Sequence, residues 1–290
     1  MRIASGFLLA VLAVAHPCAR AQAGFPNLSD IRRSPSDLEI AGDITGLPAG
    51  GARYLARADL LALPQEKFTV RDDRNFDGPT RIGGVSLREL ARRLAPKSNL
   101  VIAICDDAYR ANYPLDYILA HRPVLVLTVN GKPPSEWPKD AEDHSAAMGP
   151  FMITHPGFTP LYHVLSHREE AQIPWGVVRL EFRDQASVFA AIAPRGPLAL
   201  TPDVQSGFRI AQQNCFRCHN AGAQGGQKSG RPWEMLSHLA ASSPRRFAEY
   251  IHDPMQLNSH AQMPGNPDYD EATLHALVVY FQALQTEAHR

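Results

Sequence analysis

The pattern of apolar and polar positions predicts strands in the first two thirds of the chain. Val178–Phe182 alternates as a half-buried strand does, and Val124–Val129 is a short apolar run that ends in the turn Asn130-Gly131. Helical spacing occurs at Leu87–Leu94 and from Thr159 to about Gln172. Strands and short helices without regular βαβ alternation predict an α+β domain.

Helical signals dominate the last third of the chain. Thr201-Pro202 pairs a capping residue with a proline at the first helical position, so a helix is expected to begin there. Asp253-Pro254 is expected to end another helix, because proline cannot continue one. After Asp270, a capping residue, apolar residues recur at the spacing of a closing helix, at Leu274, Leu277, Val278, Phe281 and Leu284. These signals predict an all-α domain.

The N-terminus predicts export. Arg2 is the positive residue of a signal peptide, Phe7–Ala15 is its apolar core, and Ala19–Ala21 and Ala21–Ala23 are overlapping A-x-A cleavage sites. The apolar core is too short to span a bilayer, and no later stretch reaches about 18 uninterrupted apolar residues. We therefore expect a soluble periplasmic protein that does not insert into the membrane after the signal is cleaved.

Length and composition indicate two globular domains. The chain has 290 residues, of which 44% are apolar and 20% charged, so it is long for one domain and too apolar for a disordered protein. The expected division is a signal peptide at 1–23, an α+β domain at 24–195 and an all-α domain at 196–290. Basic and acidic residues balance at 29 each, which argues against nucleic acid as a partner.

Three cysteines remain once the signal peptide, with Cys18, is removed, and two of them stand in one motif. Cys215-Phe216-Arg217-Cys218-His219 is C-x-x-C-H, the attachment signature of haem c. Two thiols on one helical turn can both form thioethers with the haem vinyl groups, and the imidazole that follows can bind the iron. A C-x-x-C pair alone also suits a redox dithiol or half of a zinc site. The adjacent histidine and the export signal favour one covalent haem c.

The residues after this motif contain a candidate for the second iron ligand. Within Phe247–Gly265, a predicted helix end at Asp253-Pro254 is followed by a loop and then by Met263-Pro264. This stretch resembles the ligand loop of small bacterial cytochromes c, in which the methionine of a Met-Pro pair binds the iron. The resemblance implies that His219 and Met263 are the axial ligands, since methionine is the usual partner of histidine in cytochromes c.

The flanking helices resemble the same family, over roughly residues 200–287. Gly207-Phe208 stands where the first helix of these cytochromes meets the last one closely, and Tyr280-Phe281 stands at the corresponding place on the last helix. The resemblance therefore implies that these two helices cross at Gly207.

Two details of the ligand set have alternatives. His260 lies on the same loop as Met263, and bis-histidine ligation would lower the reduction potential. By resemblance, the carbonyl of Pro232 or of a neighbour accepts a hydrogen bond from Nδ1 of His219 and so orients the imidazole. The alternative is that Pro232 only shapes its loop.

Several short phrases of the predicted α+β domain resemble, in order, the molybdopterin-binding domain of the sulfite oxidase family. They are Leu38–Gly46, Ala58–Pro64, Gly84–Leu90, Asp107–Tyr109 with Pro114-Leu115, Asn130–Pro133 and Gly149–Ile153. The resemblance implies the fold of that domain. The cysteine that holds molybdenum in the family precedes the "G-V-x-L" phrase, and here Phe68–Gly84 contains no cysteine. No residue in that window can replace a thiolate on molybdenum, so we expect no molybdopterin.

Two further groups in this domain have structural explanations. Cys105 ends the apolar run that begins at Val101, where a cysteine behaves as a small hydrophobic residue. His163 and His167 have the i, i+4 spacing of a metal pair, but without a third ligand in the pattern they are expected to be packing or surface residues.

The function favoured by these expectations is single-electron transfer in the periplasm. The haem would accept electrons from a dehydrogenase and pass them to another cytochrome or an oxidase, with the α+β domain as a docking or scaffold module. One alternative is a molybdopterin-dependent oxidoreductase with a fused haem c domain, which the missing cysteine opposes. The other is a haem-based sensor, which needs an open sixth position that Met263 is expected to close.

Overall fold

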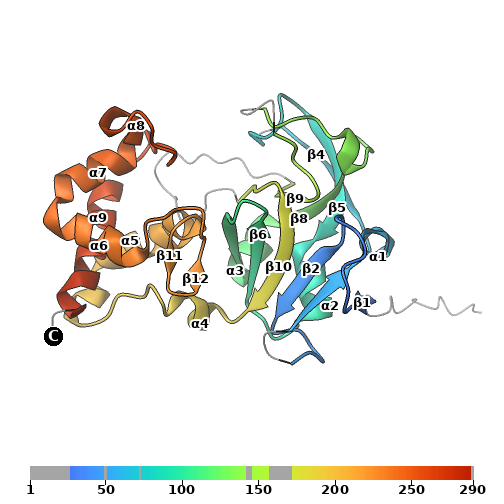
Figure 1. Cartoon of the computed structure of the whole chain (residues 1–290), viewed down its shortest axis with the longest axis horizontal. Coiled ribbons are helices and arrows are strands. Elements are labelled where there is room, and N and C mark those ends of the chain that lie inside the picture. The colour runs from blue at the N-terminus through green and yellow to red at the C-terminus, as the bar shows by residue number, and fades with distance from the viewer. Residues whose placement is uncertain (1–26, 49–50, 72, 142–145, 157–171, 289–290) are drawn as a thin grey trace, which may run out of the picture.

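The computed structural model describes residues 27–288 except 49–50, 72, 142–145 and 157–171 (Figure 1). A sheet-rich N-terminal part and a helical C-terminal part lie side by side along the long axis of the molecule. This arrangement confirms the predicted order of a mixed region followed by a helical one. The signal peptide and the helix predicted from Thr159, with His163 and His167, lie outside the described residues. Within the described part of the chain, no helix is long and apolar enough to cross a membrane.

The N-terminal part contains two sheets. The larger has the strand order β1 (Leu28–Ser29), β3 (Ala52–Leu55), β2 (Leu38–Gly42), β10 (Val177–Arg183), β6 (Leu100–Cys105) and β7 (Arg110–Pro114). The smaller has the order β4 (Glu66–Val70), β5 (Thr80–Ser86), β8 (Val124–Val129) and β9 (Met152–Thr154). The predicted strands 124–129 and 178–182 are confirmed as β8 and β10. β10 pairs parallel with β2 and antiparallel with β6, so the end of this region completes the centre of the larger sheet.

Short helices connect these strands, and two of them, α2 and α4, have side-chain N-caps. They are α1 (Arg57–Ala62), α2 (Leu87–Leu94), α3 (Leu115–His121) and α4 (Gln185–Phe189), with 3-10 turns η1 (Pro134–Glu136) and η2 (Pro197–Leu200). The predicted helix 87–94 is α2: the Ser86 hydroxyl accepts a hydrogen bond from the Glu89 amide at 3.2 Å. Its Leu87, Leu90 and Leu94 are fully buried in a core that both sheets share.

The C-terminal part consists of helices and one short hairpin, which lies on the side of the N-terminal part. Its elements are α5 (Pro202–Gln213), η3 (Cys215–Arg217), β11 (Asn220–Ala221), β12 (Gln224–Gly225), α6 (Trp233–Ser242), α7 (Pro244–His252), α8 (Pro254–Leu257) and α9 (Glu271–Ala288). The predicted end of a helix before Pro254 is confirmed, and Asp270 caps α9 by accepting from the Thr273 amide at 2.8 Å. Thr201 stands at the N-cap position of α5 as predicted, but its side chain accepts no hydrogen bond from the helix; its hydroxyl donates to the Leu198 carbonyl at 2.9 Å.

The first and last helices of this part cross at a glycine. A Cβ atom on Gly207 would lie 2.0 Å from the Ala276 carbonyl oxygen and 2.6 Å from Cβ of Tyr280. The rings of Phe208 and Tyr280 lie beside this crossing, 5.7 Å apart. The close approach of α5 and α9 at Gly207, which the cytochrome resemblance implied, is therefore present.

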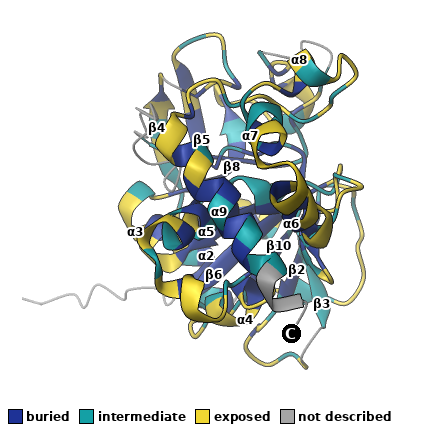
Figure 2. Ribbon diagram, turned by 90° about the vertical axis from the view of Figure 1, so that its left-hand side faces the viewer, coloured by how far each residue is buried: buried dark blue, intermediate teal, exposed yellow. Residues whose placement is uncertain are grey.

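The two parts share a hydrophobic core instead of meeting at a polar surface. Leu100 and Ile102 of β6 are buried in the same cluster as Phe189 of α4 and Phe216 of η3. Figure 2 looks through the helices toward the sheets and shows α9 buried along much of its length in front of them. The ring of Phe216, which is fully buried, packs 6.1 Å from Phe189 and 5.3 Å from Trp233. The helical part is thus built onto the outer face of the larger sheet.

One buried hydroxyl ties the connecting segment to the helices. Tyr280 on α9 donates to the Ile192 carbonyl at 2.6 Å and accepts from Nε1 of Trp233 at 3.1 Å. We expect Tyr280→Phe to lower the free energy of unfolding by about 1–3 kcal/mol, because it leaves a buried acceptor and a buried donor unsatisfied. Chemical denaturation measures the change, with Tyr54→Phe on β3 as the matched control. Equal midpoints for the two variants would contradict this role of Tyr280.

Candidate haem-binding site

The C-x-x-C-H motif forms one tight turn at the end of α5. The amides of Cys218 and His219 both donate to the Cys215 carbonyl, at 3.2 Å and 3.0 Å. This turn is the 3-10 segment η3, which is tighter than the α-helical turn expected from the spacing. Phe216, the first residue between the cysteines, enters the shared core, so packing determines which way the turn faces. The two thiols and the imidazole consequently belong to one small, fixed unit.

Both thiols are free, and neither is activated. Burial raises the pKa of Cys215 to about 12 and also raises that of Cys218. A redox-active dithiol needs a lowered pKa, because the thiolate is the nucleophile. The local environment therefore does not favour the dithiol interpretation of the motif.

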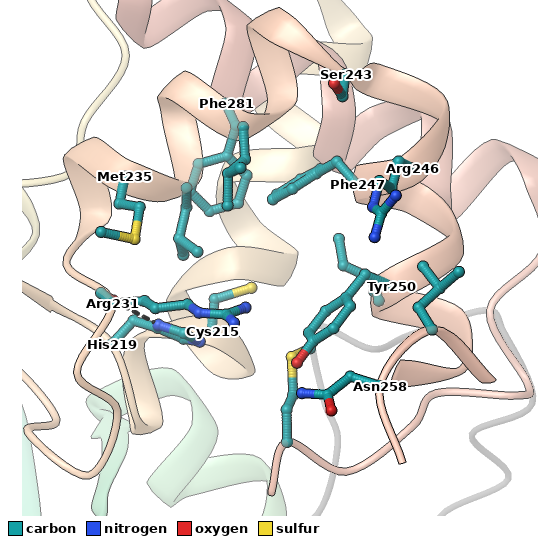
Figure 3. A pocket seen from close by; sticks show the side chains of 15 residues that line it. Cys215, His219, Arg231, Met235, Ser243, Arg246, Phe247, Tyr250, Asn258 and Phe281 are labelled. Carbon is teal, nitrogen blue, oxygen red and sulfur yellow. Dashed lines mark hydrogen bonds between the residues drawn. The ribbon is translucent and has the colours of Figure 1, made fainter. Parts of the chain in front are cut away.

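His219 is held in one orientation and one tautomer. Its Nδ1 lies 2.7 Å from the Arg231 carbonyl, a contact drawn as a dashed line in Figure 3. A carbonyl only accepts, so Nδ1 carries the proton and Nε2 presents its lone pair. Burial lowers the pKa of His219, which keeps the imidazole neutral, as a metal ligand must be. The carbonyl partner is thus the neighbour of Pro232 and not Pro232 itself.

A cavity of about 480 Å³ opens beside His219 (Figure 3). Its walls are mostly apolar and come mainly from α6, α7 and α9, with η3, α8 and the loop after α8. The lining includes Cys215, His219, Leu236, Leu239, Phe247, Ile251, Leu257, Met263 and Phe281. A second cavity of about 450 Å³ shares Cys215, His219, Ile251 and Met263 with the first and also contains Cys218. The two cavities adjoin along these shared residues.

The candidate sixth ligands differ in their position relative to these cavities. Met263 is half-buried and lines both of them. Among the described residues, His260, His252 and Met255 line neither; His260 is exposed, and Met255 is 55% exposed. The structure therefore brings Met263, and not the neighbouring His260, His252 or Met255, to the space beside His219.

The residues of this space fit a haem c. Two thiols lie on one turn, a neutral histidine presents Nε2, a thioether lies on the same cavity, and apolar side chains form the walls. A haem needs these features because its macrocycle is apolar and its iron is bound by axial ligands. When bound, haem c takes up and releases one electron at its iron.

Several residues around this space were not identified from the sequence. On the helical side, Arg231 and Arg246 line the first cavity, and the guanidinium of Arg231 lies 5.2 Å from the centre of the Tyr250 ring. From the N-terminal part, Arg74, Tyr109 and Ile173 line the second cavity. No local pattern marks these positions. Tyr109 belongs to the Asp107–Tyr109 motif, which sequence resemblance links to the sulfite oxidase family and not to the haem site.

Cys105 has the structural role expected for it. It is 4% exposed and packs in the core of the N-terminal part. Burial raises the pKa of its thiol far above the ordinary value, so the side chain stays protonated and uncharged. It therefore behaves as a small apolar residue.

Comparison with known families identifies the C-terminal part. The sequence model of the family described as cytochrome c oxidase, cbb3-type, subunit III, matches residues 202–281. No curated protein matches the chain. The C-terminal part is accordingly a cytochrome c domain, which implies haem c and electron transfer.

Proposed function

We propose that this protein is a periplasmic cytochrome with one haem c, which carries single electrons from a dehydrogenase to a downstream acceptor. The observation that carries the proposal is the joint placement of two thiols on one turn, a neutral buried His219 and the Met263 thioether around one apolar space. Electron transfer requires no acid or base, because the iron changes its charge by one while both axial ligands remain bound.

In this proposal Cys215 and Cys218 bind the haem covalently, and His219 and Met263 are the axial ligands. The Arg231 carbonyl keeps Nε2 of His219 directed at the iron by holding Nδ1. The preference for Met263 over His260 rests on the cavity lining and on the exposure of His260. Methionine ligation raises the potential relative to bis-histidine ligation, which suits a carrier between a dehydrogenase and an oxidase.

For the N-terminal part we propose a sulfite oxidase-like fold that has lost its molybdenum. Phe68–Gly84, which runs from the middle of β4 into β5, has no cysteine, and Cys105 is a protonated thiol inside the core. A thiolate ligand therefore has no source at either place. The domain would serve as a scaffold for the cytochrome domain, with which it shares a core.

The metal content of the purified protein tests the proposal. We expect one iron and no molybdenum per chain when the protein is made in a host that assembles both haem c and molybdopterin. The double variant Cys215→Ser/Cys218→Ser should lose the covalent haem, because thioethers cannot form from serine. Iron and molybdenum in equal amounts would instead support the molybdopterin-dependent oxidoreductase. Absence of covalent haem from the unmodified protein would reject both functions.

A further inference from the structure

The N-terminal domain contacts the cytochrome domain through the tight turn between β6 and β7. The Ala108 carbonyl in this turn accepts a hydrogen bond from the Gln227 amide at 3.1 Å. Asp107 forms an ion pair with Lys228, and the Lys228 ammonium lies 5.9 Å from the centre of the Tyr109 ring. Three consecutive residues of one domain are thus bound to two consecutive residues of the other.

The backbone of this turn is in a conformation that is unfavourable for its sequence. Ala108 has φ of 66°, in the left-handed region that favours glycine. The amides of Ala108 and Tyr109 are bound within the turn, to the Cys105 carbonyl at 3.1 Å and to Oδ1 of Asp107 at 2.9 Å. A strained turn of this kind persists where surrounding contacts hold it. Here two of those contacts, from Gln227 to Ala108 and from Lys228 to Asp107, come from the cytochrome domain.

Residues 226–229, which include the two residues bound to this turn, are hydrogen-bonded to the C-x-x-C-H motif. The Gly226 amide donates to the Phe216 carbonyl and the Ser229 amide donates to the Cys218 carbonyl, both at 3.0 Å. Gly226 packs so closely that an added Cβ would lie 1.7 Å from the Arg217 carbonyl oxygen. Residues 226–229 therefore lie directly on the Cys215–Cys218 turn, and the N-terminal domain reaches that turn through them.

Tyr109 also lies beside the haem space. Together with Arg74 and Ile173 it lines the cavity that contains Cys218, whereas Cys218 is not among the residues that line the first cavity. The haem edge bonded to Cys218 would consequently face the N-terminal domain. A partner protein that approached this edge would meet residues of the N-terminal domain, among them Tyr109.

The first cavity, which is not lined by the N-terminal domain among the described residues, opens between α6 and α7. Met235 is 44% exposed and Leu239 is 37% exposed at its rim, and Arg231 and Arg246 are exposed beside them. Figure 3 shows Met235 and Arg231 on one side of this space and Arg246 and Tyr250 on the other. All of these residues belong to the cytochrome domain, so the described part of the N-terminal domain leaves this mouth uncovered.

We propose that the N-terminal domain caps the haem edge beside Cys218 through the Asp107–Tyr109 turn and directs electron exchange to the mouth between α6 and α7. The proposal rests on the proposed haem c function and assigns a role to the N-terminal domain, for which no molybdenum is expected. The Tyr109 ring covers the edge, and the Asp107–Lys228 pair holds the turn in place. Electrons then pass between the haem and a redox partner that docks over Met235.

Oxidation of the ferrous protein by ferricyanide tests the exchange route. Each ferrous haem gives one electron to ferricyanide, which yields ferric haem and ferrocyanide. Met235→Glu places a negative charge at the mouth, which repels the ferricyanide trianion. The rate of haem oxidation should therefore fall by about fivefold at low ionic strength, and added salt should remove the effect. Leu200→Glu is the matched control, because Leu200 is 86% exposed, lines neither haem cavity and undergoes the same change in charge.

Opening the cap should create a second route. We expect Tyr109→Ala to be oxidised several-fold faster and to restore the rate of Met235→Glu when the two changes are combined. Tyr109→Phe keeps the ring and should react like the unmodified protein, and Tyr54→Ala controls for the loss of a half-buried tyrosine elsewhere in the domain.

Two results would overturn the cap: equal rates for Met235→Glu and Leu200→Glu, or equal rates for Tyr109→Ala and Tyr109→Phe. Unmodified protein without covalent haem would reject the proposed function instead, before any rate is measured. If Tyr109→Ala does not fold, Asp107→Asn combined with Lys228→Met loosens the same turn without removing the ring. That double variant should then give the faster oxidation, and an unchanged rate would count against the cap.

Discussion

Met263→Ala is expected to abolish the far-red sulfur-to-iron charge-transfer band of the oxidised protein and to lower its midpoint potential by about 100 mV or more. Axial ligation shifts haem potentials over a range of about 0.8 V, and the methionine thioether favours ferrous iron. Met263 lines both cavities beside His219, so its removal should leave the iron to water or to a harder ligand. Absorption spectroscopy and a redox titration measure the two effects.

Two other residues of the same segment serve as controls for this assignment. Met255 is 55% exposed and lines neither cavity, so Met255→Ala should keep both the band and the potential. His260→Ala should do the same if the histidine is not a ligand. Survival of the band in Met263→Ala, or its loss in His260→Ala, would show that the axial ligand is misassigned.

Gly207→Ala is expected to lower the free energy of unfolding by about 2 kcal/mol or more. The added methyl group would lie 2.0 Å from the Ala276 carbonyl oxygen, which is backbone and cannot move without separating α5 from α9. Alanine is the better helix former by about 1 kcal/mol, but this gain is smaller than the cost of separating two packed helices. Chemical denaturation of the haem-containing protein measures the net effect.

Gly230→Ala is the matched control for this prediction. Gly230 belongs to the same domain, and nothing lies within 4 Å of the position of its Cβ. Its replacement should change the free energy of unfolding by less than about 0.5 kcal/mol. If the two alanine variants unfold at the same denaturant concentration, the contact at Gly207 is not the constraint that the geometry indicates.

Much of the secondary structure was predictable because its causes are local. The helix 87–94 and the strand 124–129 have the bounds that their apolar patterns predicted, since periodicity records which face is buried. Asp270 caps α9 through a hydrogen bond within a single turn. Thr201 occupies the predicted N-cap position, but its side chain does not cap α5: the hydroxyl is turned toward the preceding 3-10 turn and donates to the Leu198 carbonyl.

The central part of the candidate site was also predictable from sequence. The C-x-x-C-H motif needs only the spacing of one turn, and a methionine followed by proline is recognisable by its resemblance to a known family. Secondary structure around the motif followed from the same local signals. The sequence by itself therefore determined that the last third of the chain is helical and where its thiols and candidate ligands lie.

Only the tertiary structure decided how these pieces meet. β10 lies between β2 and β6, which are far from it along the chain, and no local pattern records such pairing. The Arg231 carbonyl, and not that of Pro232, orients His219, and Tyr109 reaches the cavity beside Cys218 from the other domain. The physical reason is that these contacts depend on which buried surfaces pack together. Packing is a property of the whole folded chain, whereas periodicity, capping and motif spacing are properties of short segments.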